Sequence, residues 1–171
     1  MNGTMRGLIP SLACAAALAC AAPALAQTAT KTGQHNAWGT FSYAVAKGKV
    51  CYVLAVPADK QPATLDHGDI FFLVSQKPGQ NISFEPQFIA GYPLKEKSLI
   101  TVSVGDKSFN MFTRGKSAWM ENAAEEPALI AAMKGGSEMK IAAKSGKGNP
   151  TSYNFSLKGI SAALDSIKAC K

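Results

Sequence analysis

The sequence is short of several residue types, and each shortage excludes a class of protein. Charged residues make up 17% of the 171 residues and hydrophobic residues 47%, whereas disordered chains combine high charge with low hydrophobicity. After the first 26 residues, no apolar run reaches the length of about 18 residues that a membrane span requires. No fixed period recurs, which excludes repeat and collagen-like architectures. These absences leave a globular protein of about one domain.

The first 26 residues have the pattern of a secretory signal peptide. Arg6 supplies a positive charge near the start, and residues 8–22 are almost wholly apolar and rich in alanine. Ala24 and Ala26 place small side chains at the two positions that signal peptidase recognises. The sequence therefore predicts a signal peptide over 1–26 and a protein that is periplasmic, or secreted and associated with the cell surface.

Two other interpretations of this leader stay open. The apolar run would serve as a membrane anchor, although it is short and ends at a proline. Cys14 and Cys20 each follow a small residue, as in lipoproteins. The leucine before each of them, however, lies one position too close to the cysteine for a good lipoprotein signal.

Cysteine is scarce outside the leader. Of four cysteines, only Cys51 and Cys170 remain after the expected cleavage. An even number in an oxidising compartment favours one disulfide over two free thiols, so we expect a structural bond between Cys51 and Cys170. The sequence has no Cys-x-x-Cys redox motif and no cysteine–histidine cluster with zinc spacing.

The positive charge comes almost entirely from lysine. The formal net charge is +7, and Arg114 is the one arginine left after the leader. The lysines are scattered rather than clustered, and nucleic-acid binders usually also use arginine for bidentate contacts. We therefore expect no nucleic-acid partner. Attraction to anionic envelope or cell surfaces is physically reasonable for so basic a chain.

The part of the chain after the leader is predicted to be mainly β. Residues 27–34 are polar without periodicity and are expected to be a flexible start, followed by one β domain over 35–171. Short runs with apolar alternation or buried character are separated by turn signals and cover 41–45, 50–54, 70–74, 82–88, 100–104, 109–111 and 153–157. Gly105-Asp106 is a hairpin signal, and Pro86 predicts an edge or a bulge in its strand. Phe155 is expected to face the core, because its neighbours are polar.

Two segments change to helical spacing. The first lies near 125–134, with Pro127 close to its start and two glycines just beyond its end. The second lies near 159–168 and has its apolar residues on one face. We therefore expect an antiparallel β-sandwich or barrel-like single domain with these two helices, the last of which carries Cys170 towards Cys51.

Few residues have the pattern of an active site. His67 lies between Asp66 and Asp69, and Ser75 follows in the chain, but a turn before the next strand explains the acids and the glycine equally well. The sequence has no nucleophile elbow, phosphate-binding loop or calcium loop. We predict no catalytic, cofactor-binding or metal-binding residues, and no cofactor.

Several long motifs resemble one known family. They are 51–54 (CYVL), 67–81 (HGDIFFLVSQKPGQN), 84–94 (FEPQFIAGYPL) and 155–164 (FSLKGISAAL). They resemble the invasion-associated locus B family of exported alphaproteobacterial proteins over nearly all of the chain after the leader. The resemblance implies a mostly β, virulence-associated protein named for entry into host cells, and it brings no catalytic residues. Some branches carry a second cysteine pair before the first helix, which residues 111–120 lack.

Three functional hypotheses follow from the sequence. The leading one is an exported, non-enzymatic protein that interacts with the envelope or with a host surface through an unknown partner. The second is an exported hydrolase centred on His67 and a carboxylate. The third is a periplasmic lipid- or peptide-binding β module, which predicts a large apolar cavity between the sheets.

Overall fold

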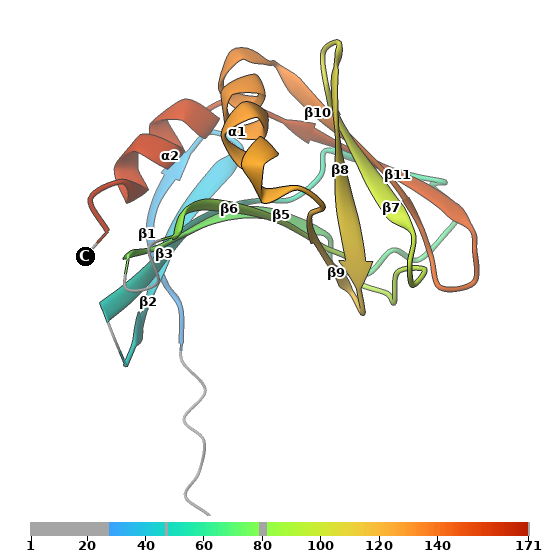
Figure 1. Cartoon of the computed structure of the whole chain (residues 1–171), viewed down its shortest axis with the longest axis horizontal. Coiled ribbons are helices and arrows are strands. Elements are labelled where there is room, and N and C mark those ends of the chain that lie inside the picture. Colours follow the sequence, from blue (N-terminus) through green and yellow to red (C-terminus); the bar gives the residue numbers. More distant parts are fainter. Residues whose placement is uncertain (1–27, 47, 79–81, 171) are drawn as a thin grey trace, which may run out of the picture.

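The fold is a single antiparallel sheet. The computed structural model describes residues 28–46, 48–78 and 82–170, and it contains an 11-stranded sheet in the order β1-β2-β3-β5-β6-β9-β8-β7-β10-β11-β4 (Figure 1). The strands are β1 (Thr30–His35), β2 (Trp38–Val45), β3 (Gly48–Ala55), β4 (Asp59–Gln61), β5 (Phe71–Lys77), β6 (Ile82–Ile89), β7 (Leu99–Val104), β8 (Lys107–Arg114), β9 (Ser117–Met120), β10 (Glu138–Lys144) and β11 (Pro150–Ser156). The expected leader over 1–26 lies outside the described residues.

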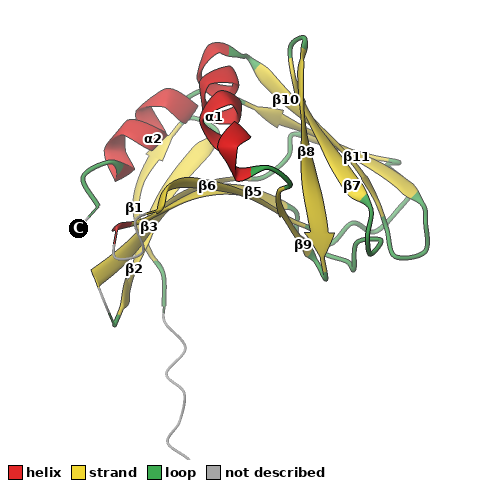
Figure 2. Cartoon of the chain, in the orientation of Figure 1, coloured by secondary structure: helices red, strands yellow, loops and turns green. Residues whose placement is uncertain are grey.

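The sheet is strongly curved, and the helices pack against one of its faces. Helix α1 (Glu126–Gly135) follows a short 3-10 turn (Ala123–Glu125) and contacts β6, and α2 (Ile160–Ile167) contacts β1, β2 and β3 (Figure 2). The prediction of a mainly β antiparallel domain with two helices is therefore confirmed. The sheet stays open, with β1 and β4 as its edges.

Hydrogen bonds bring the start of β2 to the end of β11, although no strand ladder joins these two strands. The Trp38 indole Nε1 donates to the Ser156 carbonyl oxygen over 3.0 Å, and the Ala37 amide donates to the Lys158 carbonyl oxygen over 3.2 Å. The sheet thus curls back on itself and encloses one core.

Alternation along the strands determines what the core contains. In β10 and β11, buried and more exposed side chains alternate without exception, because successive side chains of a strand point to opposite faces. Phe155 is fully buried, as its polar neighbours predicted. The expected hairpin is present as well, since Gly105 and Asp106 connect the paired residues Val104 and Lys107.

One expectation about the strands is wrong, and another is confirmed in one of its two forms. Residues 30–34 are not a structureless start but part of the edge strand β1, which pairs with β2 through its backbone. An edge strand with mostly exposed side chains leaves no apolar pattern in the sequence. For Pro86 the structure shows the bulge and not the edge. Its strand β6 is internal, but the β5–β6 ladder shifts register between Ser75 and Lys77, close to the pair of Val74 with Pro86. On the other side of β6, β9 pairs only with residues 87–89, so Pro86 needs no amide for a bond to β9.

Helix α2 is attached to the sheet by packing and by a covalent bond. Its buried residues are Ile160, Ala163, Leu164 and Ile167, the face that the helical spacing predicted. Cys170 follows the helix and forms a disulfide with Cys51 of β3, 119 positions earlier in the sequence. The last segment of the chain is thereby held against one of the first strands of the sheet.

Candidate functional site

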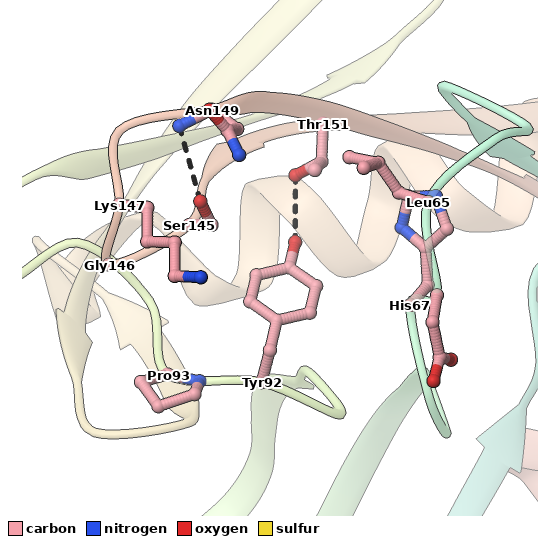
Figure 3. Close-up of a pocket in the computed structure, with 10 residues that line it drawn as sticks. Leu65, His67, Tyr92, Pro93, Ser145, Gly146, Lys147, Asn149 and Thr151 are labelled. Atoms are coloured by element: carbon pink, nitrogen blue, oxygen red, sulfur yellow. Dashed lines mark hydrogen bonds between the residues drawn. The ribbon is translucent and has the colours of Figure 1, made fainter.

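A pocket of ≈ 320 Å³ opens at one end of the sheet. Its lining comes from the loop before β5, the loop after β6, and the β10–β11 loop with the start of β11 (Figure 3). The lining residues are Leu65, Asp66, His67, Tyr92, Pro93, Ser145, Gly146, Lys147, Asn149 and Thr151. Its size is at the lower end of the range for small-molecule sites.

Two glycines bring the first two of these loops together. Gly68 has a φ of +58°, a left-handed conformation that glycine adopts without steric cost. Gly91 lies against the same turn, and a side chain there would clash with the His67 carbonyl oxygen. This close backbone approach places His67 beside Tyr92, at the base of the pocket.

The buried His67 ring is hydrogen-bonded at both nitrogens. Nε2 lies 2.9 Å from the Pro62 carbonyl oxygen, and Nδ1 lies 2.9 Å from the Tyr153 hydroxyl. A carbonyl oxygen only accepts, so Nε2 carries the hydrogen, and Nδ1 of the neutral ring accepts from Tyr153. The ring therefore has neither nitrogen free to act as a base on a ligand in the pocket.

The direction of hydrogen-bond donation continues along a chain of hydroxyl groups. The Tyr92 hydroxyl contacts the Tyr153 hydroxyl and lies 2.7 Å from Thr151 Oγ1. Because Tyr153 donates to His67, Tyr92 donates to Tyr153, and Thr151 donates to Tyr92. Burial and the hydrogen bond to Tyr92 raise the pKa of Tyr153, so its hydroxyl remains a donor. The chain ends at Thr151, which lines the pocket and whose oxygen can accept a hydrogen bond from a ligand.

The carboxylates beside His67 in the sequence do not form a catalytic group with it. Asp66 Oδ1 accepts from the Gly68 amide over 2.9 Å, which is the turn that the sequence favoured. Asp66 and Asp69 are exposed, whereas His67 is buried. Ser75 lies within β5. Among the described residues, no hydrogen bond joins His67 to a carboxylate or to a serine.

The sequence did not reveal the partners of His67. Tyr153 belongs to a strand whose alternation predicted that it is buried, but it lies 86 positions from His67. Tyr92 occupies a loop between a glycine and a proline, where no periodicity exists. A buried tyrosine hydroxyl requires a partner, but no local signal says which residue provides it.

The described residues contain no group of three or more histidine, cysteine, aspartate or glutamate side chains that could hold a metal ion. Within the same part of the chain, no helix has the length and apolar character to cross a membrane.

The pocket combines apolar walls with a polar rim. Leu65, Pro93 and the ring of Tyr92 provide the apolar surface. Figure 3 shows the Lys147 side chain extending towards Tyr92. Asn149 and Ser145 lie beside it, and the Asn149 backbone amide donates to Ser145 Oγ over 3.1 Å. This arrangement suits the binding of an apolar group whose polar end remains at the rim.

Comparison with known proteins identifies the family. The family described as invasion associated locus B (IalB) protein matches residues 38–168, most of the chain. The chain belongs to the IalB family. Its fold is similar to the crystal structure of invasion associated protein B from Bartonella henselae, with a TM-score of 0.58 and 16% identity over 82% of this chain and 97% of that one. None of the curated proteins compared with the chain matches it significantly.

Proposed function

We propose that this member of the IalB family is an exported, non-enzymatic binding protein that acts in the bacterial envelope or at a host surface. The leader and the disulfide support export, because such bonds form and persist outside the cytoplasm. If the protein is cleaved after Ala26, its first residue is Gln27. The mass of the intact protein isolated from the periplasm tests this. A lipid-modified Cys20 at the N-terminus would contradict this assignment.

The hydrogen bonding of His67 carries the non-enzymatic part of the proposal. General base catalysis requires a group that can reach the proton it removes, and both ring nitrogens are bonded inside the protein. The apolar walls and the lysine at the rim remain available to a ligand. The pocket is therefore better suited to holding a molecule than to cleaving one.

An activity panel with matched histidine variants tests the absence of catalysis. The exported form is incubated with chromogenic carboxyl esters, phosphate esters and peptides, and no turnover is expected. His67→Gln is the test variant and His35→Gln the control, because His35 is the other histidine of the chain and is only partly buried in β1. Turnover that disappears in folded His67→Gln but persists in His35→Gln would establish the hydrolase instead.

Site-specific crosslinking in intact cells tests binding at the pocket. A photoreactive phenylalanine replaces Leu65, which is 40% exposed at the pocket rim, and a second variant carries it at the exposed Asn110 of β8. We expect adducts from position 65 that are absent from position 110. Equal labelling at both positions would show that the pocket has no special role in binding.

A further inference from the structure

The end of the sheet that holds the pocket carries a concentration of positive charge. Three connections meet there: the β6–β7 loop, the β8–β9 turn and the β10–β11 loop (Figure 1). We call them the basic end. Their cationic side chains are Lys95, Lys97, Arg114, Lys116, Lys144 and Lys147, and their one acid is Glu96. Charge that is scattered along the sequence is thus gathered in space.

Backbone hydrogen bonds hold these connections side by side. The Lys95 amide donates to the Lys144 carbonyl oxygen, and the Leu94 amide donates to the Gly115 carbonyl oxygen, each over 2.9 Å. The Gly146 amide donates to the Pro93 carbonyl oxygen over 2.8 Å. The cations therefore share one surface and do not depend on loop motion to meet.

Carboxylates do not neutralise the basic end. The ion pairs of the described residues join Lys77 to Glu85, and Lys134 and Lys168 to Asp165, and none of these belongs to the three connections. The one hydrogen bond from an ammonium group of the basic end goes to a backbone atom, from Lys116 Nζ to the Gly91 carbonyl oxygen over 3.2 Å. The neighbouring loop before β5 adds two exposed acids, Asp66 and Asp69, and neither belongs to these ion pairs. The six cations outnumber the three acids, so the surface keeps a net positive charge for an outside partner.

Large apolar side chains are exposed beside these cations. Leu99 is 47% exposed and Phe112 is 43% exposed, and the two are directly paired between β7 and β8. Phe112 stacks on Trp119 of β9 with ring centroids 5.9 Å apart. On its other side, Leu99 borders a hollow of ≈ 690 Å³ that Lys140 and Lys144 also line, and no acidic residue lines it.

We propose that the basic end docks on the surface of an anionic lipid bilayer. Leu99 and Phe112 enter the boundary between the headgroups and the acyl chains, and the surrounding lysines contact lipid phosphates. Apolar side chains ringed by lysine and arginine are the usual composition of surfaces that lie in this boundary. The inference rests on the proposed function, because it assigns the envelope partner to one chemical class.

The apolar pair favours a bilayer over a soluble acidic polymer. A polymer of carboxylates or sulfates would neutralise the lysines and leave Leu99 and Phe112 in water. A bilayer offers both an anionic layer and an apolar one, so both kinds of exposed side chain are stabilised in the same complex.

Vesicle co-sedimentation tests the proposal. The exported form is mixed with vesicles of phosphatidylcholine alone, or of phosphatidylcholine and phosphatidylglycerol in equal parts. We expect binding only to the anionic vesicles, and weaker binding as salt rises. Removing one lysine near an anionic surface weakens binding by about fivefold, so Lys95→Gln with Lys144→Gln, which are both exposed at the basic end, should weaken it by about 25-fold.

A matched variant separates local charge from net charge. Lys107 and Lys158 are exposed and lie outside the basic end, so Lys107→Gln with Lys158→Gln removes the same charge from elsewhere. This control should weaken binding by less than about fivefold. Phe112→Ser should weaken binding to anionic vesicles and leave binding to soluble polyglutamate unchanged.

The tryptophans provide an independent readout. Trp38 is fully buried, whereas Trp119 is only half-buried and lies against Phe112. A blue shift of emission on anionic vesicles, which Trp119→Phe abolishes, is the expected result.

Three results would overturn the docking proposal: no preference for anionic vesicles, equal losses in the two lysine pairs, or binding to polyglutamate as tight as to vesicles with no effect of Phe112→Ser. None of them bears on whether the pocket is catalytic. Hydrolysis that depends on His67 would overturn the proposed function and leave the vesicle measurements valid.

Discussion

The two sides of this molecule are held together by different means. On one side, α2 buries an apolar face against the sheet, and a disulfide ties its end to β3. On the other side, loops meet through single backbone hydrogen bonds and through the chain from Thr151 to His67. The first side is stable because it excludes water. The second side exposes charge, apolar side chains and a pocket, which is typical of regions that bind other molecules.

Among the changes that test this comparison, removal of the disulfide is expected to lower the free energy of unfolding most. Replacing Cys51 and Cys170 with serine should lower the free energy of unfolding by about 5 kcal/mol, because the loop-entropy model assigns about that much to so long a crosslinked loop. Urea unfolding followed by circular dichroism measures the loss. Thiol labelling of the unfolded, unreduced protein should find no free thiol, and two reactive thiols per chain would contradict the bond.

Removing the ring of Phe155 should have the next largest effect. Phe155→Ala leaves a cavity in the core and should cost roughly 3–5 kcal/mol. Phe112→Ala, which removes the same ring from an exposed position, should cost about 1 kcal/mol, mostly from its stacking on Trp119. Chemical denaturation of both variants checks the difference, and similar losses would mean that the two faces of the sheet are assigned the wrong way round.

A smaller effect is expected at the pocket. Tyr153→Phe keeps the ring but leaves Nδ1 of His67 and the Tyr92 hydroxyl without their shared partner, which should cost about 1–3 kcal/mol. Tyr43→Phe, a half-buried tyrosine on β2, is the control and should be close to neutral. The same denaturation experiment applies. A neutral Tyr153→Phe would show that the hydroxyl chain does not stabilise the loops.

The smallest effect concerns alkaline pH. The pKa of Tyr153 is raised in the folded protein, first by burial and then by its bond to Tyr92, so above pH 10 the unfolded chain loses this proton more readily than the folded one. Its contribution to stability is therefore complete below pH 10 and decreases as pH rises further. Stability measured between pH 9 and 11, values chosen to bracket the ordinary tyrosine pKa of about 10, should fall less steeply in Tyr153→Phe than in Tyr43→Phe.

Local patterns predicted single elements of the molecule better than the contacts between distant segments. The face of α2 and the Gly105-Asp106 hairpin depend on residues that are neighbours in the sequence, and both are present. Phe155 was also placed correctly, because alternation between faces is a local property. Elements that bury an apolar face are thus largely predictable from hydrophobic periodicity.

The pocket and the basic end could not be predicted in the same way. The contact between His67 and Tyr153 spans 86 positions, and the cations of the basic end come from three separate connections. Their meeting depends on the order of the strands in the sheet, which hydrophobic periodicity does not specify. Strand β1 was missed for a related reason, since an edge strand is held by backbone hydrogen bonds whatever its side chains are.

The bonds from Trp38 to Ser156 and from Ala37 to Lys158 have a consequence for the timing of folding. They join an early part of the chain, at the start of β2, to a late part, at the end of β11, across 118 positions in the case of Trp38. Under the proposed export, a chain that crosses a membrane from its N-terminus would deliver β2 and β3 long before β11 and α2. The early strands would then wait, with one face uncovered and the Cys51 thiol without its partner, until α2 and Cys170 emerge. During that interval the nascent protein would be open to chaperones and to wrong disulfide partners.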